Sequence, residues 1–132
     1  MNPALSEQSK SSALIGNAPM TESDRKWNRM WELYGNGELK KIDPNAYLLC
    51  EYDGGINGEG HSGWFSNHRR ELEQLRSMYR TVLPNAFYIN LSMALEAFGT
   101  DREDEVCEIA DNWFYSHEQR IIELLNEHAE RL

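Results

Sequence analysis

The sequence predicts an all-α protein, folded as a compact bundle of about five to seven helices. Apolar residues recur at steps of three and four along most of the chain after residue 20, as they do on the buried face of a helix. No segment alternates polar and apolar residues for long enough to form a convincing strand. With 132 residues, the chain suits one domain. We expect residues 1–20 to be an N-terminal tail or linker and residues 21–132 to form a single helical domain.

The first helix is predicted to begin after Thr21. Residues 1–20 are rich in Ser, Asn and Ala and show no sustained periodicity, which is typical of a tail. Thr21 and Asp24 have the spacing of a capping box. Gly35 and Gly37 are expected to end the helix. Between these limits, one helical face carries Trp27, Met30, Trp31 and Tyr34.

A second helix is predicted to start at Asp43 and Pro44, because Asp caps helices and Pro is tolerated at the first helical position. It runs to Tyr52, where a glycine-rich stretch begins. Glycine is unfavourable inside a helix and favours backbone with positive φ. We therefore predict a structural glycine-rich loop between the second and third helices, with Trp64 and Phe65 buried at its exit. Its motif residues are Gly58, Gly60, His61, Gly63, Trp64, Phe65 and Asn67.

Further helices are predicted from Ser62 onward. A short helix carries His68, and a longer one presents Leu72, Leu75, Tyr79 and Val82 before the break at Pro84. The next spans about 85–98, with Gly99 as its C′ residue. Thr100 and Glu103 have capping-box spacing. The helix that follows is expected to end near residue 114, and Ser116 to start a last one. The inward residues expected after Gly99 are Val106, Ile109, Ala110, Trp113, Phe114, Ile121, Leu124, Leu125 and His128.

The glycine-rich stretch matches two ligand-binding patterns only in part. Residues 58–63 read GxGxxG, but a dinucleotide site needs a preceding strand and a later acidic residue. Asp53 could open a calcium loop, yet position twelve is Trp64 instead of Glu. His61 and His68 lack further ligands at metal-site spacing. We expect no cofactor and no metal, with His61 and Asn67 in structural hydrogen bonds.

An enzyme or small-ligand site remains the alternative. Cys50, His61 and Asn67 are the residue types of a thiol nucleophile, a base and an orienting group, although a buried cysteine is the commoner explanation for Cys50. A pocket around His61 would be lined by Tyr52 and Trp64. Its polar groups would be Asp53, Glu59 and Asn67.

The acidic charge is concentrated near the C-terminus. The net charge is −9, and residues 96–132 contribute −8 of it, with 11 acidic and 3 basic residues. Direct binding of nucleic acid is disfavoured, because the chain has no basic face. Acidic residues at steps of three and four lie about 5–6 Å apart on a helix. We expect a basic protein, such as a DNA-binding regulator, to bind the face formed by Asp101, Asp104, Glu105, Glu108 and Asp111.

Membrane association is not expected. No apolar run approaches the roughly 20 residues that span a bilayer, and the N-terminus does not resemble a signal peptide. Cys50 and Cys107 are far apart in the sequence, which suits reduced thiols better than a disulfide framework. These features predict a cytoplasmic protein.

Two blocks between about Asp43 and Phe114 resemble the DMP19-like family of small acidic helical proteins. Residues 60–67, GHSGWFSN, are similar to the family's GHxQ[YF]FxN core, and residues 93–100, MALEAFGT, to its downstream A-L-x-x-I-G-A block. Gly63 replaces the family's usual Gln, and Glu59 interrupts its Asn-Gly-Gly. The resemblance implies an all-α fold. It also implies the function of the family's named member, an acidic dimer that mimics DNA by imitating phosphates with carboxylates, and it leaves a homodimer open.

Overall fold

The computed structural model describes residues 19–132 and is helical throughout, with no strand in that part of the chain. The all-α prediction is confirmed. The tail predicted for residues 1–20 falls almost entirely outside the described residues. The elements are α1 (Glu22–Gly35), α2 (Leu39–Ile42), α3 (Pro44–Asn67), the 3-10 helix η1 (Arg69–Glu71), α4 (Leu72–Tyr79), α5 (Asn85–Ala97) and α6 (Glu103–Glu130).

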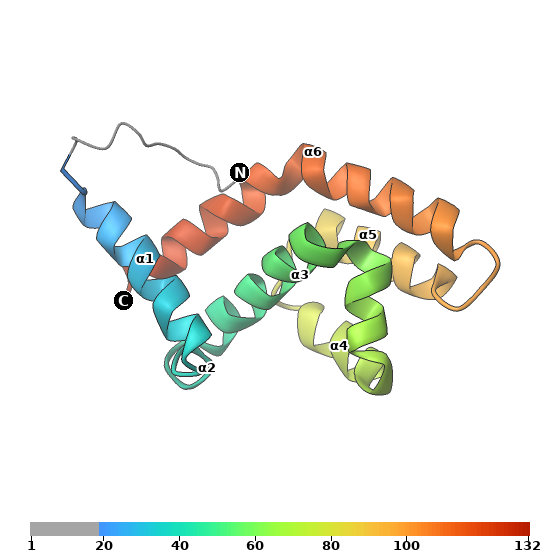
Figure 1. Cartoon of the computed structure of the whole chain (residues 1–132), viewed down its shortest axis with the longest axis horizontal. Coiled ribbons are helices and arrows are strands. Elements are labelled where there is room, and N and C mark those ends of the chain that lie inside the picture. Colours follow the sequence, from blue (N-terminus) through green and yellow to red (C-terminus); the bar gives the residue numbers. More distant parts are fainter. Residues whose placement is uncertain (1–18) are drawn as a thin grey trace.

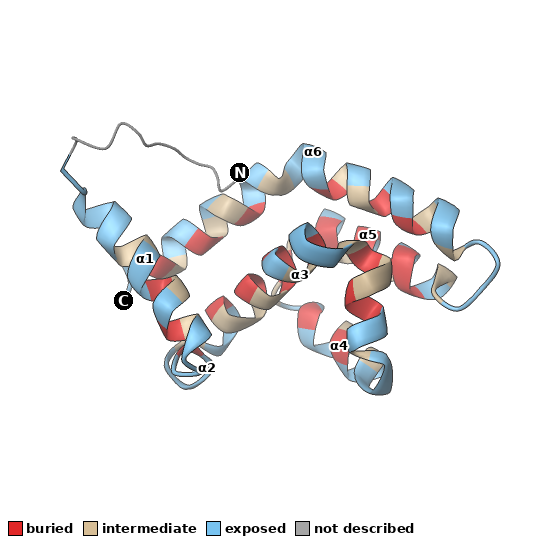
Figure 2. Cartoon of the chain, in the orientation of Figure 1, coloured by how far each residue is buried: buried red, intermediate tan, exposed pale blue. Residues whose placement is uncertain are grey.

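The last helix, α6, organises the bundle. It is 28 residues long and packs against α3, α5 and α1 (Figure 1). Its buried positions face the other helices, while much of its outer surface is exposed along its whole length (Figure 2). Among residues 19–132, no helix has both the length and the apolar character that crossing a bilayer requires.

An aromatic cluster lies at the centre of the core. The ring of Tyr52 is 5.8 Å from that of Trp64, 5.8 Å from that of Tyr79 and 5.4 Å from that of Phe114. Trp64 and Phe65 are 2% and 0% exposed, which confirms their predicted burial. These contacts join α3, α4 and α6, and the core cluster extends from Met30 on α1 to Ala129 on α6.

Most predicted helix boundaries are confirmed. Thr21 and Asp24 form the capping box of α1. Asp43 accepts a hydrogen bond from the Ala46 N–H at 3.2 Å, with Pro44 in the first position of α3. Gly99 follows the end of α5 with a φ of 83°.

The glycine-rich stretch is a helix, so the predicted loop is wrong. The second helix and the short helix near Ser62 are the two parts of α3, and only Gly60 has non-helical dihedral angles, φ 70° and ψ 174°, which kink it. A Cβ on Gly55 would clash with Cδ1 of Trp64. The missing side chain therefore lets the Trp64 ring pack onto the helix. Close tertiary packing of this kind outweighs the poor intrinsic helix propensity of glycine.

The C-terminal region also differs from its prediction. Ser116 does not start a helix, since its hydroxyl donates to the Asn112 carbonyl at 3.0 Å inside the continuous α6. The capping box of Thr100 and Glu103 is absent because α6 begins at Glu103, whose carboxylate instead accepts from the Gly99 N–H at 2.9 Å. Ile109, expected in the core, is 54% exposed.

Candidate functional site

The kink at Gly60 brings α3 into direct polar contact with α6. Asp111 Oδ1 lies 2.8 Å from the His61 backbone nitrogen and 2.6 Å from His61 Nδ1. A carboxylate only accepts hydrogen bonds, so the backbone nitrogen and Nδ1 of His61 both donate to it. A Cβ on Gly60 would lie 2.7 Å from Asp111 Oδ2. The glycine is therefore required here both by its positive φ and by the space that Asp111 fills.

This contact removes Asp111 from the predicted partner-binding face. His61 is 0% exposed, while the Asp111 side chain is 26% exposed. A buried histidine needs partners for its polar atoms, and Asp111 provides one for Nδ1. Asp111 thus has a structural role between α3 and α6. The expectation that His61 makes a structural hydrogen bond is confirmed, although it holds a helix junction instead of a loop.

Glu103 forms a second contact between the same helices. Its carboxylate accepts hydrogen bonds from the Ser62 hydroxyl and from the Gly99 N–H. These two donors lower the pKa of Glu103, because they stabilise its ionised form. Glu103 therefore connects the kinked end of α3 to the turn before α6.

Asp53 and Glu118 form a pair of carboxyl groups farther along the same interface. Asp53 is 7% exposed, and Asn57 donates to Glu118 at 2.7 Å. Burial, and then the neighbouring Glu118, raise the pKa of Asp53 well above its ordinary value. Two carboxylates held this close cannot both be ionised without a cost, so Asp53 retains its proton more strongly than a surface aspartate.

The remaining predicted acidic residues form an outward surface, which we call the acidic face: Asp101, Asp104, Glu105 and Glu108. All four are exposed. Glu105 pairs with Arg102 at 3.2 Å, and both side chains are 64% exposed. No Lys, Arg or His within residues 19–132 forms an ion pair with the other three. Their charge is therefore left to solvent or to a partner.

The residues expected to line the alternative pocket, Tyr52, His61 and Trp64, are buried in the core. The rings of Tyr52 and Trp64 pack edge to face in the core, so they fill the space that a ligand would need. Burial raises the pKa of the Cys50 thiol, which disfavours the nucleophilic thiolate. Asn67 donates to Glu59 at 2.6 Å, so it makes a structural hydrogen bond, as expected. These residues are thus occupied by packing and by contacts within the fold.

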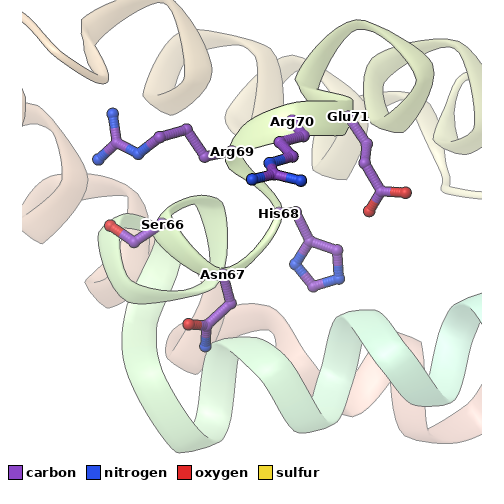
Figure 3. A pocket seen from close by; sticks show the side chains of 6 residues that line it. All are labelled: Ser66, Asn67, His68, Arg69, Arg70 and Glu71. Atoms are coloured by element: carbon purple, nitrogen blue, oxygen red, sulfur yellow. The ribbon is translucent and has the colours of Figure 1, made fainter.

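A depression of about 350 Å³ lies at the junction between α3 and α4. It is lined by six consecutive residues, Ser66, Asn67, His68, Arg69, Arg70 and Glu71 (Figure 3). The His68 ring packs on Trp64, with centroids 5.4 Å apart, and Arg69 lies over the Phe98 ring at 5.1 Å. Two of its lining side chains therefore support the core.

Metal ligands do not gather in the part of the chain that the structure describes: no three His, Cys, Asp or Glu side chains are placed to share an ion. His61 and His68 each have a protein partner, Asp111 and the Trp64 carbonyl respectively. In both histidines, Nδ1 makes a hydrogen bond within the fold.

We did not predict from the sequence that the side chains of Asp111 and Glu118 contact α3, although a pattern indicates it. Both lie at alternating steps of four and three among the buried residues of α6, and both accept hydrogen bonds from residues of α3, His61 and Asn57 respectively. The stripe formed by these positions is Cys107, Asp111, Phe114, Glu118, Ile121 and Leu125. Acidic residues that interrupt such a stripe are candidates for buried polar contacts.

No protein-family model matches the chain, and no curated protein or solved structure is significantly similar to it.

Proposed function

We propose that this chain is a non-enzymatic binding protein that presents the acidic face of α6 to a basic protein partner. The observation that carries the proposal is the exposure of Asp101, Asp104 and Glu108, none of which forms an ion pair with a Lys, Arg or His of residues 19–132. Unpaired like charges repel one another. A partner with Lys or Arg side chains would relieve that repulsion.

The helix dipole explains the positions of only some of these acidic residues. Glu103, Asp104 and Glu105 lie in the first turn of α6, where the positive end of the dipole favours acidic residues. Glu108 lies beyond that turn, where the effect has decayed. A role in recognition explains why carboxylates continue outward along the helix.

The partner we propose is a DNA-binding protein whose basic surface accepts α6 in place of DNA. Asp104 and Glu108 lie four residues apart on α6, which places them about 5–6 Å apart, and Asp101 lies in the turn just before the helix. Basic surfaces that bind phosphates recognise closely spaced negative charges. The resemblance of residues 60–67 and 93–100 to the DMP19-like family supports the same proposal.

Capture from a cell lysate, followed by elution with a salt gradient, tests the proposal. The immobilised wild-type protein is compared with the triple variant Asp101→Asn, Asp104→Asn and Glu108→Gln. The matched control is Glu38→Gln, Glu71→Gln and Glu73→Gln, which removes the same charge from exposed positions elsewhere. We expect the triple variant to release its basic partner at lower salt, because charge attraction is screened by ions. Equal elution from all three proteins would contradict the proposal.

A further inference from the structure

Three large apolar side chains are exposed on the outer surface of α5 and α6. Ile89 is 58% exposed, Met93 41% and Ile109 54%. Exposed apolar side chains that gather on one surface are typical of protein interaction sites. We call this set the apolar patch.

The register of the two helices places these residues together. Asn90 donates to the Ala110 carbonyl at 3.0 Å, and Cys107 Sγ lies 3.9 Å from the Ala94 carbonyl. Ile109 directly precedes Ala110, and Met93 directly precedes Ala94. One residue is a turn of about 100° around a helix. The patch residues are therefore rotated away from the contact between α5 and α6 and toward solvent.

Three carboxylates lie beside the apolar patch. Glu96, which lies 3.9 Å from Arg76, follows Met93 by one turn on α5. Glu105, which pairs with Arg102, and Glu108, which has no ion pair within residues 19–132, flank Ile109 on α6. All three are exposed, and Glu105 and Glu108 belong to the acidic face. The surface thus combines an apolar centre with acidic edges. Its chemical complement is a helix with apolar residues on one face and Lys or Arg along the borders of that face.

We infer that the apolar patch binds a basic amphipathic helix of the partner protein. The inference rests on the proposed function and specifies which segment of the partner is recognised. A second copy of this chain is the less favourable occupant, because it would bring Glu96, Glu105 and Glu108 against the same carboxylates. Methionine in the patch suits such binding, since its flexible side chain adapts to different apolar surfaces.

The test uses the full chain and two labelled peptides of equal composition. One is a Leu/Lys peptide of about 18 residues, or five helical turns, with Leu at steps of three and four. The other has the same residues in scrambled order, so it has equal charge and no apolar face. Binding is measured by fluorescence anisotropy at several salt concentrations. The patch variant is Met93→Gln with Ile109→Gln, and its matched control is Ile42→Gln with Met78→Gln, which changes exposed apolar residues elsewhere.

We expect the wild type and the control variant to prefer the amphipathic peptide. The patch variant should bind it about tenfold more weakly, as expected when two apolar contacts are lost, and should bind the scrambled peptide unchanged. All four substituted side chains are exposed, so melts should match within a few degrees.

Three outcomes would overturn the inference. If the patch variant binds both peptides as the wild type does, with the same salt dependence, the apolar patch has no role. The proposed binding by the acidic face is then retained. If the wild type binds neither peptide at low salt, the proposed function itself fails. If sedimentation shows a wild-type dimer that the patch variant lacks, the patch is occupied by a second copy.

Discussion

A single carboxylate oxygen, Asp111 Oδ1, accepts hydrogen bonds from both the backbone nitrogen and Nδ1 of His61, at 2.8 and 2.6 Å. The contact joins residues 50 positions apart in the sequence and locks the kink of α3 onto α6. It separates the acids of α6 into two groups. Some, like Asp111, hold the fold together, and others, like Glu108, face solvent.

Replacing Asp111 should therefore destabilise the protein. Asp111→Ala leaves the two His61 donors without their acceptor, and an unsatisfied buried donor costs about 1–3 kcal/mol. The change in the free energy of unfolding can be measured by chemical denaturation. Glu108→Ala, on the exposed side of the same helix, is the control and should stay within about 0.5 kcal/mol of wild type. Equal stability of the two variants would show that the His61 contact contributes nothing.

Gly60→Ala should also be destabilising. The dihedral angles of Gly60, φ 70° and ψ 174°, belong to a region that is essentially restricted to glycine, and other residues pay about 1–3 kcal/mol there. The new Cβ would in addition press on Asp111. Thermal melts of the variant should show a clearly lower Tm than wild type.

Gly58→Ala is the matched control for this substitution. Gly58 is helical, and a Cβ there would meet no other atom within 4 Å. Alanine is favoured over glycine inside a helix by roughly 0.5–1 kcal/mol, so this variant should be more stable than wild type. If alanine affects positions 58 and 60 alike, the kink does not depend on Gly60.

Stability should depend on pH through Asp53. Its pKa in the folded protein is raised, mainly by burial and then by Glu118, above the ordinary value of about 4 in the unfolded chain. The folded state thus holds the proton more tightly. This contribution to stability is complete below about pH 4 and is lost as the pH rises through the raised pKa.

Denaturation at a series of pH values checks this dependence. Asp53→Asn should flatten the fall in unfolding free energy above pH 4, because the titrating group is gone. Glu118→Gln should flatten it less, since burial of Asp53 remains the larger cause. A wild-type profile that is unchanged by Asp53→Asn would contradict the assignment.

The sequence predicted helices correctly where the preferences of neighbouring residues agree with the packing of the whole fold. Thr21, Asp43 with Pro44, and Gly99 each have a short-range role that their residue types reveal. The glycine-rich stretch could not be predicted in this way. Its helical state depends on Trp64 packing over Gly55 and on Asp111 contacting Gly60 and His61. The contacts of Asp111 join residues that are far apart in the sequence.

The sequence grouped Asp111 with the exposed acids of α6, whereas the structure directs its carboxylate to His61. Counting charges identifies an acidic segment and cannot show which side chains turn inward. Asp111 lies one residue from the buried Ala110. Its contact with His61, which the sequence does not reveal, shows that it stabilises the fold. Ile109 shows the converse error, because apolar character alone predicted burial for a side chain that is 54% exposed.

The most direct test of the account is competition between this protein and DNA for the captured basic partner. Labelled duplex DNA bound to that partner is titrated with the wild type, with the Asp101→Asn, Asp104→Asn, Glu108→Gln variant and with the Glu38→Gln, Glu71→Gln, Glu73→Gln control, and anisotropy is followed. The account predicts that the wild type and the control displace the DNA, whereas the acidic-face variant requires about tenfold more protein, or about 1.4 kcal/mol of lost binding. DNA that remains bound while the wild-type protein joins the same complex would contradict it.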